Sequence, residues 1–96
     1  MADEIRETVV EIKNLYGLHM RPAMMFAELA AGFDSDIRIV SESMDVDGKS
    51  IAEVMTLGLP AGSKIKVIAK GCDSAKALEA IVELVEQRLF DEATAS

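Results

Sequence analysis

The sequence predicts an α+β fold in which three helices cover one face of a four-stranded, mainly antiparallel sheet. Two segments, 8–13 and 64–70, alternate apolar and polar residues as half-buried strands do. Two others, from Met20 and from about Asp73, carry apolar residues at helical spacing. A chain of 96 residues builds one core, and a sheet with one apolar face buries that face under helices. We therefore expect a single domain over 1–96 with the order β-α-β-β-α-β-α.

The predicted strands follow from alternation and from turn residues. The first covers 8–13, the second covers 37–40, and a short third covers 44–47 before the turn at Asp47-Gly48. The fourth, 64–70, ends at Gly71.

The predicted helices begin and end at capping and breaking residues. The first runs from Met20 to near Gly32, and Asp73 or Ser74 caps the last, whose end frays over 91–96. Between them, Ser50 and Glu53 have the spacing of a capping box, which predicts a short helix ending near Leu57. The apolar stripes of the two long helices are Ala23, Phe26, Ala27 and Ala30 in the first and Leu78, Ile81, Val82, Val85 and Leu89 in the last.

The composition excludes several classes of function. A net charge of −7 and a pI of about 4.6 disfavour binding to nucleic acid or to acidic membranes. One cysteine, Cys72, and one histidine, His19, cannot build a zinc site or an internal disulfide. We expect no metal, no cofactor and no membrane insertion. The acidic first residues do not resemble a signal peptide, so we expect a cytoplasmic protein.

The segment Gly17-Leu18-His19-Met20-Arg21-Pro22-Ala23 combines residues that suit phosphoryl chemistry. Gly17 allows a sharp turn, and Pro22 is tolerated in the first turn of a helix, which places His19 at or next to the N-cap. Backbone N–H groups, the helix dipole and Arg21 could there stabilise an anionic group on the imidazole. A histidine that only caps the helix or packs on the surface is equally compatible with this pattern.

This segment resembles the active-site signature of the HPr family, the histidine-containing phosphocarriers of the phosphoenolpyruvate-dependent phosphotransferase system. A second segment, Gly48-Lys49-Ser50-Ile51 followed by Val54-Met55-Thr56-Leu57-Gly58, resembles the regulatory-serine segment of that family. The resemblance extends from about Thr8 to Leu89. It implies the HPr-like open-faced β-sandwich, the same order of elements that the patterning predicts.

The resemblance also implies a function and partners. His19 would accept a phosphoryl group on Nδ1 from enzyme I and pass it to an enzyme IIA-type domain. Arg21 would balance the phosphoryl charge, while Gly17 and Pro22 would shape the turn. Such a protein is a carrier, not an enzyme, and nothing in the sequence requires more than a monomer.

Ser50 has two interpretations. It is a sufficient N-cap for the helix that follows, and by resemblance it is a target of an HPr kinase. Glu53 would repel a phosphate at Ser50. A regulatory docking module of the same fold, controlled through Ser50, is therefore the alternative function.

The starts of the first two helices are expected to form a partner-binding surface in the HPr-like fold. The predicted residues are Met20, Met24, Ile51, Ala52 and Met55. Adaptable methionines suit a surface that binds several partners in turn, although Met24 or Met25 could equally belong to the core. Charge supports the same surface, because 13–33 and 49–72 are the only stretches without a net negative charge.

Overall fold

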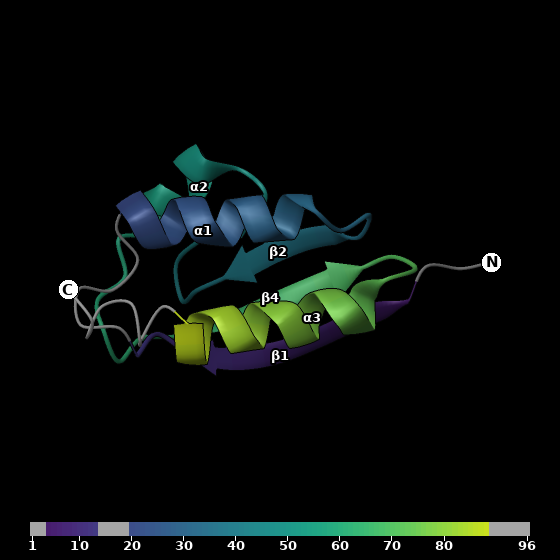
Figure 1. Ribbon diagram of the computed structural model, residues 1–96. Helices are drawn as coiled ribbons and strands as arrows, with labels where there is room; N and C mark the ends of the chain where they lie inside the picture. The colour runs from purple at the N-terminus through teal and green to yellow at the C-terminus, as the bar shows by residue number, and fades with distance from the viewer. Residues whose placement is uncertain (1–3, 14–19, 89–96) are drawn as a thin grey trace.

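The computed structural model describes residues 4–13 and 20–88 and confirms the predicted order of elements (Figure 1). All strands pair antiparallel in a four-stranded sheet of order β1-β4-β2-β3. The elements are β1 (Ile5–Glu11), α1 (Met20–Ala31), β2 (Asp36–Val40), β3 (Asp45–Asp47), α2 (Ile51–Thr56), β4 (Lys64–Lys70), α3 (Ser74–Glu83) and the π-helical turn η1 (Leu84–Arg88).

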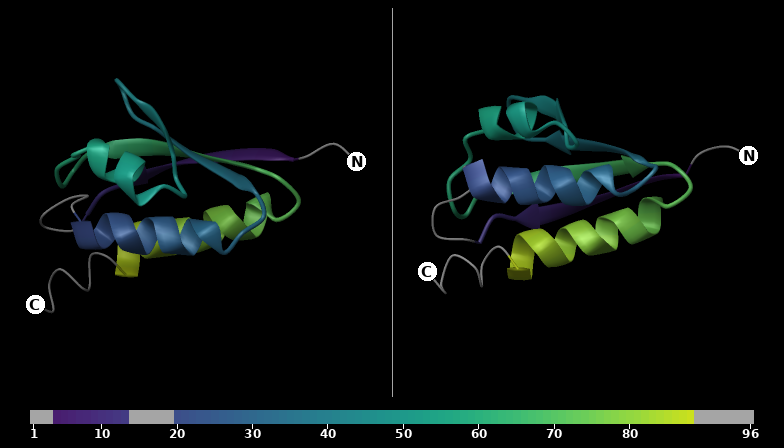
Figure 2. Two further views of the ribbon diagram at one scale, coloured as in Figure 1. Left: turned by 90° about the horizontal axis from the view of Figure 1, so that it is seen from above. Right: turned by 45° about the horizontal axis from the view of Figure 1, so that its top comes forward.

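The helices form a single layer on one face of the sheet. α1 and α3 lie side by side across the sheet, and α2 lies against α1 and β3 (Figures 1 and 2). The stripe predicted for α1 is buried, with Phe26 at its centre. In α3, Leu78, Ile81 and Val85 are buried and Val82 packs against the core from its edge. The opposite face of the sheet is not covered by a described helix, so the open-faced sandwich is confirmed.

The first strand begins earlier than predicted, at Ile5 instead of Thr8, and it ends at Glu11. The alternation marked only Val10 and Ile12, which are buried beneath the helices. Ile5 is exposed, so no burial pattern could reveal its place in the sheet. Pairing with β4 along its whole length extends the strand, since Ile5 lies opposite Lys70 and Glu11 lies opposite Lys64.

The last helix changes its winding before it ends. α3 is α-helical as far as Glu83, and η1 continues it as one wider turn to Arg88. Leu84 and Val85 are buried in that turn, so the apolar stripe stays against the core. Leu89 and the predicted frayed segment, 91–96, lie outside the described residues.

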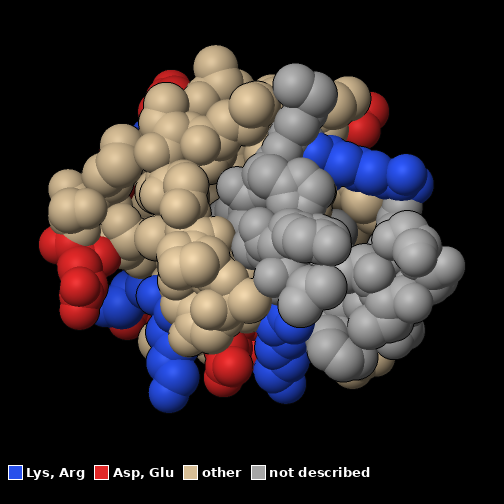
Figure 3. Space-filling view, turned by 90° about the vertical axis from the view of Figure 1, so that its left-hand side faces the viewer, with Lys and Arg blue, Asp and Glu red and all other residues tan. Residues whose placement is uncertain are grey.

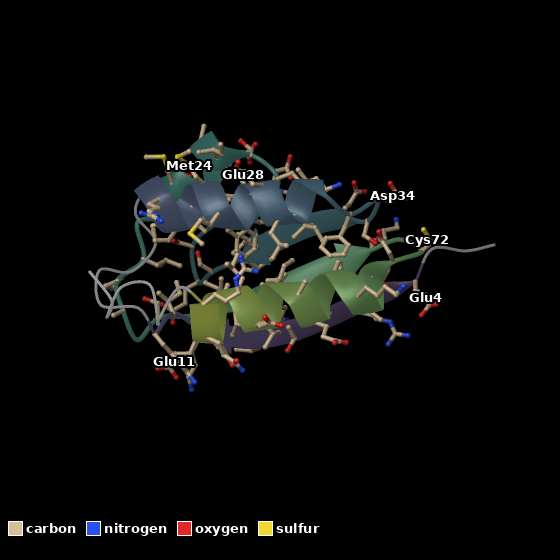
Figure 4. The ribbon with its side chains drawn as sticks, in the orientation of Figure 1. Glu4, Glu11, Met24, Glu28, Asp34 and Cys72 are labelled. Atoms are coloured by element: carbon tan, nitrogen blue, oxygen red, sulfur yellow. The ribbon has the colours of Figure 1, made fainter. Side chains whose placement is uncertain are left out.

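Asp73 occupies the N-cap position of α3 but does not cap that helix with its side chain. Its carboxylate instead accepts the backbone N–H groups of Asp34 and Ser35, both at 2.9 Å, and the Ser35 hydroxyl. The hydroxyl of Ser35 is the main reason that the pKa of Asp73 lies below its ordinary value. Asp73 is thus the N-cap residue, as one of the two predicted positions, but its carboxylate hydrogen-bonds the turn between α1 and β2 instead of the first turn of α3. Cys72 is exposed beside this turn, far from the start of α1 (Figure 4).

Candidate functional site

α1 begins at Met20, and its sequence determines how it can begin there. Pro22 is the third helical residue, and it is buried. A proline in the first turn costs no hydrogen bond because the N–H groups there have no partner within the helix. Arg21 is exposed in the same turn. The chain therefore enters α1 directly after His19, which together with Gly17 lies outside the described residues.

Ser50 is the N-cap residue of α2. Its backbone is extended (φ −100°, ψ 114°), and its hydroxyl accepts the N–H of Glu53 at 3.2 Å. α2 then runs from Ile51 to Thr56 with Leu57 at its C-cap, as predicted. This half of the capping box is confirmed.

The reciprocal half of the predicted capping box is wrong. The Glu53 carboxylate does not return to the backbone of Ser50, but accepts the N–H of Asp47 at 3.1 Å. The Ser50 N–H instead donates to the carbonyl of Asp47, also at 3.1 Å. The turn at Asp47-Gly48 brings these groups close, and the carboxylate of Glu53 is thereby held on the β3 side of α2.

The segment before α2 is also tied to α1. The Nζ of Lys49 donates to the carbonyl of Phe33 at 2.8 Å, just beyond the end of α1. The Lys49 N–H donates to the side chain of Asp47 at 2.9 Å. No pattern in the sequence predicts this link to Phe33, because the two residues are separated by sixteen positions and by a hairpin. Lys49, the residue before Ser50, therefore links the segment that leads into α2 to the end of α1.

The exposed apolar residues of α1 and α2 form one surface, which we call the α1–α2 patch and define as Met24, Ile51, Ala52 and Met55. Met24, Ile51 and Met55 are 40, 39 and 38% exposed, and Ala52 is also exposed. α1 packs on α2, and Met24 lies on the side of α1 next to α2 (Figure 4). Met20, also predicted for this surface, is the first residue of α1, but its side chain lies outside the described part.

The alternative that these methionines belong to the core applies to Met25 alone. Met25 is partly buried against the core, whereas Met24 projects outward.

Figure 3 faces the end of the molecule at which α1 begins. A surface free of charged residues lies there, and both basic and acidic side chains lie at its margin.

The positive stretch 49–72 does not gather on this surface as expected. Lys64, Lys66 and Lys70 alternate along β4 with buried residues, so they project from the uncovered face of the sheet. Lys66 is paired there with Glu7 at 3.5 Å. The net charge of a segment does not predict which face of the protein is positive, because successive side chains of a strand point to opposite faces of the sheet.

Other kinds of site find no support in the described residues. No three of their histidine, cysteine, aspartate and glutamate side chains are grouped to hold a metal ion. None of their helices is long and apolar enough to cross a membrane.

Comparison with known proteins finds relatives that match most of the chain. The family model described as "PTS HPr component phosphorylation site" matches residues 6–87. The chain is 38% identical over 81 residues to a phosphocarrier protein HPr of Vibrio cholerae, which covers 84% of this chain and 95% of the relative. It is also 38% identical over 81 residues to an HPr-like protein Crh of Halalkalibacterium halodurans, covering 84% of this chain and 96% of that one.

The solved structures agree with the sequence comparison. A crystal structure of HPr-C-His from Thermoanaerobacter tengcongensis has a TM-score of 0.83 and 39% identity, covering 88% of this chain and 94% of that chain. A structure described as an HPr dimer from the same organism has a TM-score of 0.70.

Proposed function

The chain belongs to the HPr family of phosphocarrier proteins, and we propose that it accepts a phosphoryl group on His19 from phosphorylated enzyme I and passes it to enzyme IIA-type domains. The observation that carries this proposal is the family match over 6–87, which includes His19 and both segments noted in the sequence. The start of α1 directly after His19 supports it. As a carrier and not an enzyme, the protein needs one nucleophile and surfaces for two partners.

The transfer needs no group besides the histidine and its surroundings. Nδ1 of neutral His19 would attack the phosphorus of the donor's phosphohistidine, and the donor's N–P bond would break as the new N–P bond forms. In the second transfer His19 would be the donor, and the same phosphoryl group would pass from it to the acceptor protein. Arg21 and the unbonded N–H groups of the first turn of α1 would stabilise the negative charge.

The α1–α2 patch is proposed as the docking surface for both partners. It lies at the start of α1, close to the point where the chain leaves His19, and apolar side chains dominate it. Exposed methionines adapt to differently shaped surfaces. We propose a cytoplasmic protein that works as a monomer, with enzyme I and the enzyme IIA-type domain docking in turn.

Ser50 is proposed as a secondary, regulatory site for an HPr kinase. The chain is equally identical in sequence to a phosphocarrier HPr and to an HPr-like protein Crh. A docking module that is controlled through Ser50 is therefore the second candidate function. The hydroxyl of Ser50 lies at a helix N-terminus, where a phosphate is electrostatically tolerated. The carboxylates of Glu53 and Asp47 would repel such a phosphate, since both are hydrogen-bonded within the turn that leads into Ser50.

Incubation with radiolabelled phosphoenolpyruvate and a bacterial enzyme I tests the carrier function. We expect one acid-labile, base-stable phosphoryl group, which His19→Ala abolishes and Ser50→Ala retains. Arg21→Ala is expected to fold normally and to transfer the group more slowly. Label that persists in His19→Ala would refute the assignment, and unchanged kinetics in Arg21→Ala would remove Arg21 from the site. Incubation with ATP and an HPr kinase tests Ser50, with Ser50→Ala as its control.

A further inference from the structure

β1 forms one edge of the sheet, and its hydrogen bonds reveal which way each residue faces. Among the described residues, β1 pairs only with β4. At one end, the carbonyl of Glu4 accepts the N–H of Gly71 at 2.9 Å. At the other end, the N–H of Ile12 donates to the carbonyl of Ser63 at 2.8 Å. The even-numbered residues therefore direct their backbone groups toward the β4 side.

The odd-numbered residues of β1 consequently direct their backbone groups outward, because the direction alternates along an antiparallel strand. Glu11 confirms this, since its N–H bonds the side chain of Glu86 at 3.1 Å instead of a neighbouring strand. The N–H and C=O groups of Ile5, Glu7 and Val9 have no partner among the described residues. Three consecutive outward positions can bind another extended chain.

The side chains along this edge are apolar where an added strand would lie. Ile5 and Val9 are 64% and 58% exposed, more than any other large hydrophobic residue in the described part of the chain. They sit on the uncovered face of the sheet, one on each side of Glu7. A chain added beside β1 would place alternate side chains against them.

On the helix side of this edge, Arg6 of β1 is paired with Glu4 at 2.7 Å, and the neighbouring helix carries glutamates. Glu86 in η1 accepts the backbone N–H of Glu11, and α3, which packs against β1, carries the exposed residues Glu79 and Glu83. These three glutamates have no ion pair within the described residues. Glu4 and Glu11 lie at the two ends of β1 (Figure 4).

We propose that the free edge of β1 accepts an extended segment of a partner protein as an additional strand, and that this segment alternates lysine or arginine with apolar residues. Its apolar side chains would cover Ile5 and Val9, and its basic side chains would face Glu79 and Glu83. A second copy of this chain fits the edge poorly. Pairing two β1 edges would bring their glutamates together in a protein of net charge −7.

This surface is distinct from the one proposed for phosphotransfer. α2 packs against β3, at the opposite edge of the sheet from β1. The α1–α2 patch and the β1 edge therefore lie on opposite sides of the molecule (Figure 1). A partner held at β1 leaves the patch open, so the carrier could be retained by one protein while it exchanges phosphoryl groups with others.

Titration of the full-length, isotope-labelled protein with the peptide acetyl-Lys-Val-Lys-Val-Lys-Val-Lys-amide tests the proposal. We expect amide exchange at Ile5, Glu7 and Val9 to slow about tenfold or more at saturation, while the already bonded N–H of Glu11 changes little. The same peptide methylated at every backbone nitrogen is expected not to bind. The same peptide with glutamate in place of lysine is expected to bind at least about fivefold more weakly.

Variants of the protein separate the backbone and charge contributions. Val9→Pro removes an outward N–H without removing a bond to β4, and it is expected to weaken the basic peptide about fivefold or more. Glu83→Gln is expected to weaken it about two- to fivefold at low salt, whereas Glu42→Gln, in the distant loop between β2 and β3, leaves affinity unchanged.

Three results would overturn the proposal. They are binding by the methylated peptide, chemical-shift changes confined to the α1–α2 patch, and exchange protection at Ile5, Glu7 and Val9 in a dimer without peptide. The last would assign the edge to a second copy. Transfer from enzyme I to His19 is measured on the same samples. It is expected to be unaffected, so failure of this proposal leaves the carrier function intact.

Discussion

Removal of the Ser50 hydroxyl separates its structural role from any regulatory one. Ser50→Ala deletes the acceptor of the Glu53 N–H, a bond of 3.2 Å at the start of a helix of six residues. Loss of such a cap costs about 1 kcal/mol, within a range of about 0.5–2. The Glu53 carboxylate cannot compensate because it is held by the N–H of Asp47. We therefore expect a loss of about 1 kcal/mol, which corresponds to a fall in Tm of about 4–8 °C in a domain of this size.

Urea unfolding followed by far-ultraviolet circular dichroism measures this loss, since the chain has no tryptophan to report by fluorescence. Ser43→Ala is the matched control, because Ser43 is an exposed loop serine with no hydrogen bond in the described structure. Ser50→Asp retains an acceptor at the cap and is expected to stay closer to the wild type than Ser50→Ala. Equal stability of Ser50→Ala and Ser43→Ala would refute the capping argument, as would an aspartate variant that is the least stable of the three.

Four further substitutions test other parts of the structure. Asp73→Asn is expected to destabilise the fold above about pH 4 and to lose that effect at lower pH. The pKa of Asp73 is lowered by folding, so the stabilisation that its carboxylate contributes disappears as the carboxylate protonates. Urea unfolding from pH 3 to 7 measures this effect, and a pH-independent difference in stability would contradict it. Gly71→Ala is expected to cost about 1–3 kcal/mol, because φ is +153° and a Cβ would lie 2.6 Å from the Ser35 Oγ. Gly58→Ala, where a Cβ meets open space, is expected to cost less, and the reverse order would be inconsistent with crowding at Gly71. Met24→Glu is expected to raise the KM for phosphorylation by enzyme I with little change in Tm; an unchanged KM would exclude Met24 from docking.

The sequence predicted those elements whose residues alternate between core and solvent. The apolar stripe of α1 and the alternation in β4 each reported burial directly, and both are confirmed. For Ile5 and Val9, apolar character does not indicate burial, because both residues lie on the uncovered face of the sheet. Their strand depends on backbone pairing with β4, and such pairing leaves no mark in the local pattern.

Contacts between polar groups were the hardest to predict. Asp73 and Glu53 suggested local roles, as a cap and a reciprocal cap, and no pattern in the sequence assigned a contact to Lys49. Each side chain instead bonds a backbone group presented by a turn or helix end elsewhere in the fold. Ser50 was predicted correctly because its cap is completed within three residues. The predicted roles of His19 and Arg21 depend on family membership and remain predictions.

The position of Cys72 offers an experimental convenience. It is the only cysteine of the chain, its thiol is exposed, and it lies at the opposite end of the molecule from the start of α1. A maleimide dye or a biotin linker would therefore attach at one place and in one orientation. A surface loaded in this way would present every copy with the α1 end outward, so that binding of enzyme I could be timed molecule by molecule on otherwise unmodified protein.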